Sequence, residues 1–270
     1  MILGLSLGPA CPASLPDLRD IAMLCEEGRL DFILAGYAPP EAMPAWDPLS
    51  LVSALVGVTV HIGLAATIPT DGWAPFNVAR ALSALDLLSG GRAAWLASPG
   101  DDQGRSREHL EATFALMDSW EDGALVFDKE RCVFTDSAKV HRIRHSGRWF
   151  TVDGPLNSPR PPQGRPVLLQ GQSSFTHDQA DVRLMDLPFT LGPGSGQGPE
   201  AMAERLAREF EAGRAIGFNL MPANLARDTH ALVRWVIPWL QARGLAQLDY
   251  GDGDLRTRLG LKRPANRFAT

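Results

Sequence analysis

The sequence predicts an α/β fold in which a parallel sheet, closed as a (β/α) barrel, is covered by helices. Three observations predict it. Apolar runs and amphipathic segments alternate along most of the chain, each strand-and-helix unit takes roughly 25 to 35 residues, and the strand candidates are continuously apolar. Continuous apolar runs are typical of strands that are buried on both faces.

Four such units are expected in the first part of the chain. Their helix candidates place apolar residues three and four positions apart, as Ile21, Leu24 and Cys25 do. The third helix has Pro75 in its first turn and stops at a glycine pair, which are common signals of helix ends. In chain order the units are 2–7 with 18–30, 31–37 with 49–58, 61–68 with 75–88, and 92–98 with 107–120.

The alternation breaks between residues 121 and 165. Strand-like segments at 132–134 and 148–152 flank the turn signal Ser146-Gly147, so a hairpin excursion from the main sheet is expected there. The pattern then resumes, and the residues from about 251 to 270 form a polar, arginine-rich arm. The later strands are expected at 166–170, 183–190 and 215–221, and the later helices at 200–212 and 229–243.

This count gives about seven barrel strands, one fewer than the eight of a complete barrel. The barrel is therefore expected to be incomplete. No linker and no internal repeat divides the chain, so we expect residues 1–270 to form a single domain.

Composition and charge argue against several function classes. The 270 residues are 45% hydrophobic and 21% charged with a formal net charge of -5, which gives no electrostatic footprint for nucleic acid. No apolar run approaches the roughly 20 residues that span a bilayer, and the N-terminus lacks the features of a signal peptide. Three scattered cysteines without a C-x-x-C pair fit a reducing compartment. We therefore expect a cytoplasmic protein that binds neither membranes nor nucleic acid.

Few residue patterns carry chemistry by themselves. His141 and His145 lie four residues apart, but they fall in the predicted excursion without a third ligand, so no metal site is expected. Asp101 and Asp102 follow the fourth strand, where a barrel keeps its active site, although a solvated loop is the commoner role. The segment 192–200, GPGSGQGPE, lacks the lysine of a phosphate-binding loop.

The pair Ser173 and Ser174 is better placed for binding. It follows PVLLQGQ, at the end of an expected strand and the start of an expected helix. Free backbone N–H groups and two hydroxyls there suit a phosphate monoester. Helix N-capping is the alternative role.

Several long blocks of sequence resemble a known family. PFNVARALSALDLLSGGRAAW, DSWEDGALV and GFNLMP, together with the LRTRLGLKRP tail, are similar to the nitrilotriacetate monooxygenase/dibenzothiophene-sulfone monooxygenase group of the bacterial luciferase-like superfamily. So are the stretch from Lys139 to Ser174 and DPLSLVSALVGVTVHIGLAAT. The blocks are collinear and cover most of the chain from about Leu30 to Pro264.

The resemblance implies a TIM-type (β/α) barrel of the luciferase-like kind that binds reduced FMN at the C-terminal ends of its strands. Such proteins react the flavin with oxygen and oxygenate a small organic substrate. A separate flavin reductase would supply the reduced FMN, and relatives are typically dimers, so we expect a homodimer.

The resemblance also assigns contacts residue by residue. Thr67 is expected to hydrogen-bond the isoalloxazine edge, and Ser173 and Ser174 the phosphate. Gln170 and Ser98, at neighbouring strand ends, are further candidates. Trp73 or Trp95 would form a wall of the pocket. No catalytic side chain is assigned, because the flavin carries the chemistry.

The chain also departs from the family pattern. Family members are longer, and the region between Ser174 and Glu200 is shortened here. Gly36 stands where the family places an acidic residue, and Pro99 and Gln103 stand near positions of a His and a Tyr that help to hold the flavin phosphate. Two alternatives to a monooxygenase therefore stay open: a non-catalytic protein that binds flavin or another ligand, and a structural or regulatory component of a longer monooxygenase.

Overall fold

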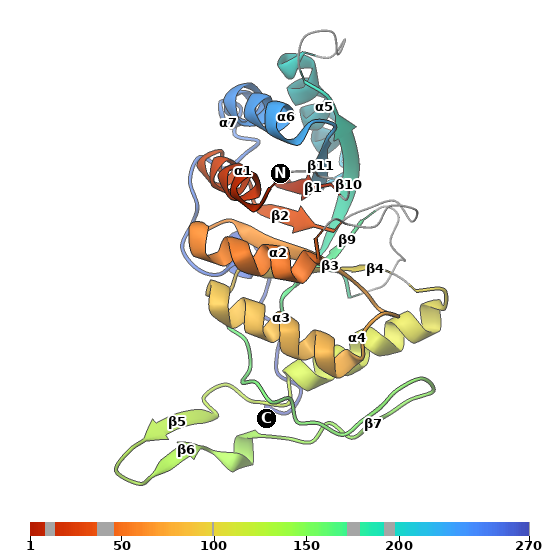
Figure 1. Cartoon of the computed structure of the whole chain (residues 1–270), viewed down its shortest axis with the longest axis vertical. Helices are drawn as coiled ribbons and strands as arrows, with labels where there is room; N and C mark the ends of the chain where they lie inside the picture. The colour runs from red at the N-terminus through yellow and green to blue at the C-terminus, as the bar shows by residue number, and fades with distance from the viewer. Residues whose placement is uncertain (9–13, 37–45, 99, 172–178, 192–197, 270) are drawn as a thin grey trace.

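Seven parallel strands form a closed barrel in the computed structural model, which describes residues 1–8, 14–36, 46–98, 100–171, 179–191 and 198–269 (Figure 1). Around the barrel the strand order is β1, β11, β10, β9, β4, β3 and β2. The strands are β1 (Ile2–Leu7), β2 (Phe32–Ala35), β3 (Gly63–Pro69), β4 (Ala93–Ser98), β9 (Val167–Gln170), β10 (Val182–Phe189) and β11 (Gly217–Pro222).

The predicted barrel with about seven strands is confirmed. It was expected to be incomplete, yet the sheet closes without an eighth strand among the residues that the structure describes. The pairing of β11 with β1 runs from Ile2–Gly217 to Leu5–Leu220, and that of β9 with β10 is short, joining Leu169 to Val182 and Gln170 to Arg183.

Helices cover the outer face of the barrel, as the alternating pattern predicts (Figure 1). Outward-facing strand residues such as Leu5, Ile33 and Trp95 pack with the helices in one large apolar core. The helices around the barrel are α1 (Leu15–Glu27), α2 (Pro48–Leu55), α3 (Pro75–Ser89), α4 (Gln103–Met117), α5 (Pro199–Glu211), α6 (Leu225–Ala231) and α7 (Ile237–Gln241). In the part of the chain that is described, no helix has the length and apolarity needed to cross a membrane.

Two helices differ from their predicted limits for identifiable reasons. Helix α4 begins at Gln103 rather than Arg107, because the carboxylate of Asp102 accepts the N–H groups of Gly104 and Arg105 at 2.8 and 3.0 Å and caps the first turn. The predicted helix 229–243 is divided by a π-helical turn, Leu232–Val236, just before Pro238, which cannot donate a backbone hydrogen bond.

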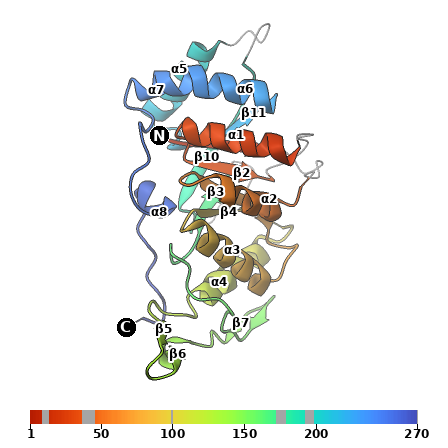
Figure 2. The same ribbon diagram turned by 60° about the vertical axis from the view of Figure 1, so that its left-hand side comes forward.

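The C-terminal arm closes the N-terminal end of the barrel. Its short helix α8 (Leu255–Arg258) packs Leu255 against the inward-facing apolar residues, and Leu259 and Leu261 join the same cluster. The N–H of Leu255 donates to the carbonyl oxygen of Gly91 at 2.8 Å. Gly91 has a φ of +87°, and a Cβ there would lie 2.7 Å from the Cβ of Asp254, so this approach requires glycine. Figure 2 shows the arm running from α7 past α8 toward β5 and β6.

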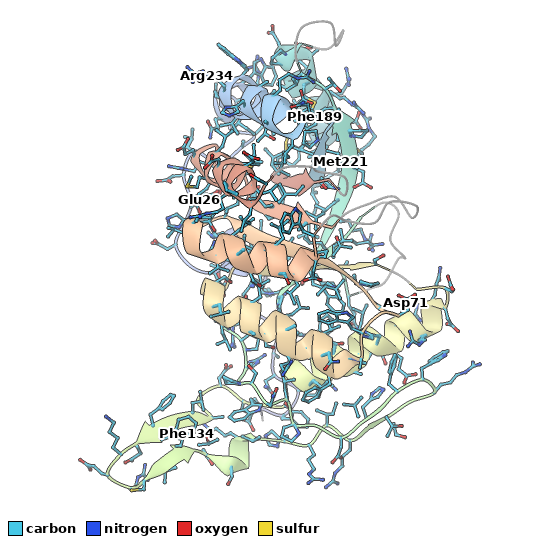
Figure 3. All side chains as sticks on the ribbon, in the orientation of Figure 1. Glu26, Asp71, Phe134, Phe189, Met221 and Arg234 are labelled. Atoms are coloured by element: carbon cyan, nitrogen blue, oxygen red, sulfur yellow. The ribbon has the colours of Figure 1, made fainter. Side chains whose placement is uncertain are left out.

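The excursion between α4 and β9 contains two small sheets. The expected strand segments 132–134 and 148–152 do not pair with each other: β6 (Val133–Thr135) pairs with β5 (Leu125–Asp128), and β8 (Thr151–Val152) pairs with β7 (His145–Ser146). Figure 3 shows Phe134 on the β5–β6 hairpin, which extends away from the barrel.

One buried carboxylate joins the second hairpin to the barrel layer. Glu108 of α4 accepts the N–H groups of Arg148, Trp149 and Phe150 and contacts Nε2 of His145 at 3.2 Å. These contacts explain why the single-hairpin prediction was wrong, because the pairing is set by a helix residue distant in sequence.

Candidate active site

The inner face of the barrel changes from apolar to polar toward the C-terminal ends of the strands. Near the N-terminal ends it carries apolar residues such as Phe32, Ala65 and Val167. Because side chains alternate between the two faces of a strand, the same inward side continues with five polar residues from five strands. We call these the polar ring: Ser6 of β1, Thr67 of β3, Ser98 of β4, Asp186 of β10 and Asn219 of β11.

Three oxygens of the polar ring are buried without a hydrogen-bond partner in the described part of the chain. They are Oγ of Ser6, Oγ1 of Thr67 and Oδ1 of Asn219. Asn219 is fully buried, and its Nδ2 donates to Oδ1 of Asp186 at 2.9 Å, which leaves the amide oxygen unused. Buried polar atoms are nearly always paired, so three unpaired oxygens on one inner surface indicate a site that a ligand completes.

The predicted cofactor residues fall into three groups. Thr67 and Ser98 lie on the inward side of neighbouring strands, where Pro69 pairs with Ser98. Gln170 lies on the side of β9 that carries Leu168, a residue of the outer core, so we keep only the first two in the polar ring. The predicted contacts Ser173 and Ser174 fall outside the described residues.

The two tryptophans do not form a common wall. Trp95 is buried on the outer side of β4, where Nε1 donates to the carbonyl of Ile68 at 3.1 Å and the ring packs edge-on against His109 and Phe114. The expectation that Trp95 lines the pocket is therefore wrong, because strand alternation turns it toward the helices. Trp73 lies in the turn after β3 and is 39% exposed.

Packing explains the glycine that follows β2. Gly36 has a φ of +80°, and a Cβ at this position would overlap the ring of Pro48 at the start of α2. An acidic side chain is thus excluded here by the close approach of the helix.

Three members of the polar ring were not predicted from the sequence. Ser6, Asp186 and Asn219 are each a single polar residue within an otherwise apolar stretch of strand. That signal is available in the sequence, since a buried strand has no solvent-facing side on which to place such a residue.

The other candidate groups have structural partners. His141 contacts Glu121 at 2.6 Å and His145 contacts Glu108 at 3.2 Å, so the two histidines face different carboxylates. Asp102 caps the first turn of α4. Within the described ranges no group of three or more His, Cys, Asp or Glu side chains could hold a metal ion.

His109 lies buried beneath the loops at the mouth of the barrel. Its Nε2 lies 2.9 Å from the carbonyl oxygen of Trp73, and its Nδ1 lies 3.4 Å from the hydroxyl of Thr113. Burial lowers the pKa of His109 to about 4, with a smaller contribution from the charge of Arg105, while the Trp73 carbonyl and Asp71 act in the opposite direction.

This pKa predicts a loss of stability in acid. The unfolded chain protonates His109 near its ordinary pKa of 6.5 and the folded chain only near 4. The stability that depends on neutral His109 is therefore complete above pH 6.5 and is lost as the pH falls from 6.5 to 4, by about 3 kcal/mol. Urea denaturation of the wild type and of His109→Gln at pH 7.5 and 4.5 checks this. The advantage of the wild type should shrink at pH 4.5, whereas His141→Gln should show no comparable change. A pH-independent difference would contradict the prediction.

Comparisons with known proteins agree on one family. A family model described as luciferase-like monooxygenase matches residues 4–234. Dibenzothiophene-sulfone monooxygenase of Rhodococcus erythropolis is 40% identical over 167 residues, which cover 55% of this chain and 37% of that protein. The chain thus spans well under half the length of that relative.

One relative is matched over nearly its whole length. This relative, the shorter of two matched components of pristinamycin IIA synthase from Streptomyces pristinaespiralis, is 36% identical over 271 residues, covering 97% of this chain and 94% of that protein. The longer component of the same synthase is 32% identical, covering 70% of this chain and 46% of its own length. Among solved structures, a riboflavin lyase superposes with a TM-score of 0.84 at 20% identity, covering 97% of this chain and 96% of that one.

Proposed function

We propose that this chain, which belongs to the luciferase-like monooxygenase family, uses reduced FMN and oxygen to oxygenate a small organic substrate at the mouth of its barrel. The resemblance found in the sequence blocks is confirmed by the family match. The observation that carries the proposed activity is the polar ring, in which Ser6, Thr67 and Asn219 have buried oxygens without partners in the described part of the chain.

The residues present fit one end of a flavin. The isoalloxazine edge carries both hydrogen-bond donors and acceptors, and it could pair with Oγ1 of Thr67 and Oδ1 of Asn219. Ser173 and Ser174 stay the predicted contacts for the phosphate. When bound, reduced FMN supplies the activation of oxygen. The chain would bind and orient it, and the apolar inner wall below the ring would exclude water from that side.

The source of reduced FMN and the location of the protein are part of the proposal. No residue pattern indicates a nicotinamide site, so a separate flavin reductase would supply the reduced cofactor. The cysteine pattern supports a cytoplasmic setting. The acceptor is a small molecule that enters between the loops at the C-terminal strand ends.

A second form of this function is favoured by the relative that is matched over nearly its whole length. That relative is named as one component of a synthase, and a longer component of the same synthase is also similar to this chain. We therefore propose, as the alternative to the homodimer, that this chain pairs with a longer luciferase-like chain and that the two together form the monooxygenase.

Oxygen consumption distinguishes the two forms. Purified chain is mixed with FMN, NADH, a flavin reductase and candidate substrates, with and without a longer luciferase-like chain from the same source. Substrate-dependent formation of oxygenated product by the chain alone supports the homodimer. Product that forms only with both chains supports the paired form. Flavin binding without product in either mixture would contradict the proposed activity and leave a binding protein.

A further inference from the structure

A second, cationic cavity lies at the opposite end of the barrel from the polar ring. It has a volume of about 190 Å³ and is lined by Phe114, Arg165, Gln179, Asp181 and Arg256, with two prolines. Arg165 and Asp181 lie just before β9 and β10, so the cavity lies at the N-terminal ends of these strands. Arg256 comes from α8 of the C-terminal arm.

The charges around this cavity do not balance. Arg256 is 2% exposed and forms a two-point ion pair with Asp181, with N–O distances of 2.7 and 2.8 Å. That pair uses the one carboxylate among the described residues that line the cavity. The second guanidinium, of Arg165, is left as an excess positive charge in a partly buried place.

Arg165 has no side-chain hydrogen-bond or ion-pair partner in the described part of the chain. Its guanidinium lies over the ring of Phe114, 4.8 Å from the centroid, and its Nε is buried and unpaired. The Nε of Arg256 is buried and unpaired as well. The nearby Asp118 already contacts Arg160 and Arg267, at 3.4 and 3.7 Å. Two unpaired N–H donors and one uncompensated charge therefore border the same cavity.

We propose that this cavity binds a small oxyanion, of the phosphate or sulfate kind, between Arg165 and Arg256. Planar guanidinium groups match the oxygens of such anions with two parallel hydrogen bonds, and a charged partner removes the cost of an unpaired buried cation. The bound anion would join the segment before β9 to the C-terminal arm. It would thereby stabilise the closed N-terminal end of the barrel, away from the site proposed for flavin.

Inorganic phosphate is the probe for the test. Protein dialysed into chloride buffer is titrated with phosphate at constant ionic strength, by calorimetry and by thermal unfolding. The wild type should bind one phosphate saturably and gain Tm. Arg165→Met should bind at least about tenfold more weakly, because charge-assisted hydrogen bonds are lost. In chloride its Tm should not fall below that of the wild type, because an unpaired charge is removed.

Two further variants keep the result interpretable. Arg243→Met removes an arginine that also lies over an aromatic ring, that of Trp239, but is exposed elsewhere on the surface, so phosphate binding should be unchanged. Arg165→Lys keeps the charge without the planar fork and should bind with intermediate strength. Sulfate should replace phosphate and acetate should compete poorly, whereas tighter acetate binding would overturn the choice of anion and assign a carboxylate instead. An equal response in Arg165→Met and the wild type, or no saturable binding by the wild type, would overturn the proposal.

Discussion

Replacing Arg256 with methionine is expected to lower the free energy of unfolding by about 3–5 kcal/mol. The guanidinium is almost completely buried and forms a two-point ion pair with Asp181. It also donates to the carbonyls of Arg165, Pro166 and Lys262. Methionine fills a similar length but leaves the Asp181 carboxylate without its counter-charge. The same change releases α8 from the end of the barrel that Leu255 closes.

The matched control lies on the same arm. Arg263 forms a two-point pair with Asp122, both distances being 2.7 Å, but the two side chains are 40% and 57% exposed. Water and salt screen such a pair, so Arg263→Met should cost only about 0–1 kcal/mol. Adding Asp181→Asn to Arg256→Met should recover part of the loss, because the unpaired charge is gone. Equal costs for Arg256→Met and Arg263→Met in urea denaturation would contradict the role of the buried pair.

The second large effect is expected on flavin binding. The double variant Thr67→Val with Asn219→Leu keeps the shapes of both side chains and removes the oxygens that have no partner among the described residues. If these oxygens contact the flavin, each loss weakens binding by about tenfold, and the two together by about a hundredfold. Fluorescence titration with FMN measures this loss, and circular dichroism checks that the barrel is intact.

A buried threonine outside the barrel provides the control. Thr229 of α6 is fully buried and its Oγ1 also lacks a partner among the described residues, but it lies outside the polar ring. Thr229→Val should leave the Kd for FMN unchanged. If the double variant binds FMN as the wild type does, the flavin does not lie against the polar ring.

Much of the fold follows from local sequence signals, because apolar runs and helix-end residues act over short distances. The strands and most helices lie near their predicted positions for this reason. Closure with seven strands depends instead on pairing between distant strands, as between Leu169 and Val182, and no local pattern reports it. The same holds for the excursion, in which Glu108 determines where the second hairpin packs.

The candidate site was predictable only in part, because the barrel itself assembles it. Thr67 and Ser98 came from resemblance, and both lie in the polar ring. Ser6 and Asn219 are isolated polar residues in strands far apart in the sequence, and they share a surface only once β1 pairs with β11. The different setting of Gln170 depends on the phase of strand alternation, which a four-residue strand leaves ambiguous in the sequence.

Direct titration of the purified chain with FMN tests the central claim, that the mouth of this barrel binds flavin. Oxidised FMN is added in air and reduced FMN under anaerobic conditions, while intrinsic fluorescence and Tm are recorded. We predict saturable binding of one FMN per chain, tighter for the reduced form, and a higher Tm in its presence. Unchanged fluorescence and Tm with both forms at millimolar concentration would contradict the claim.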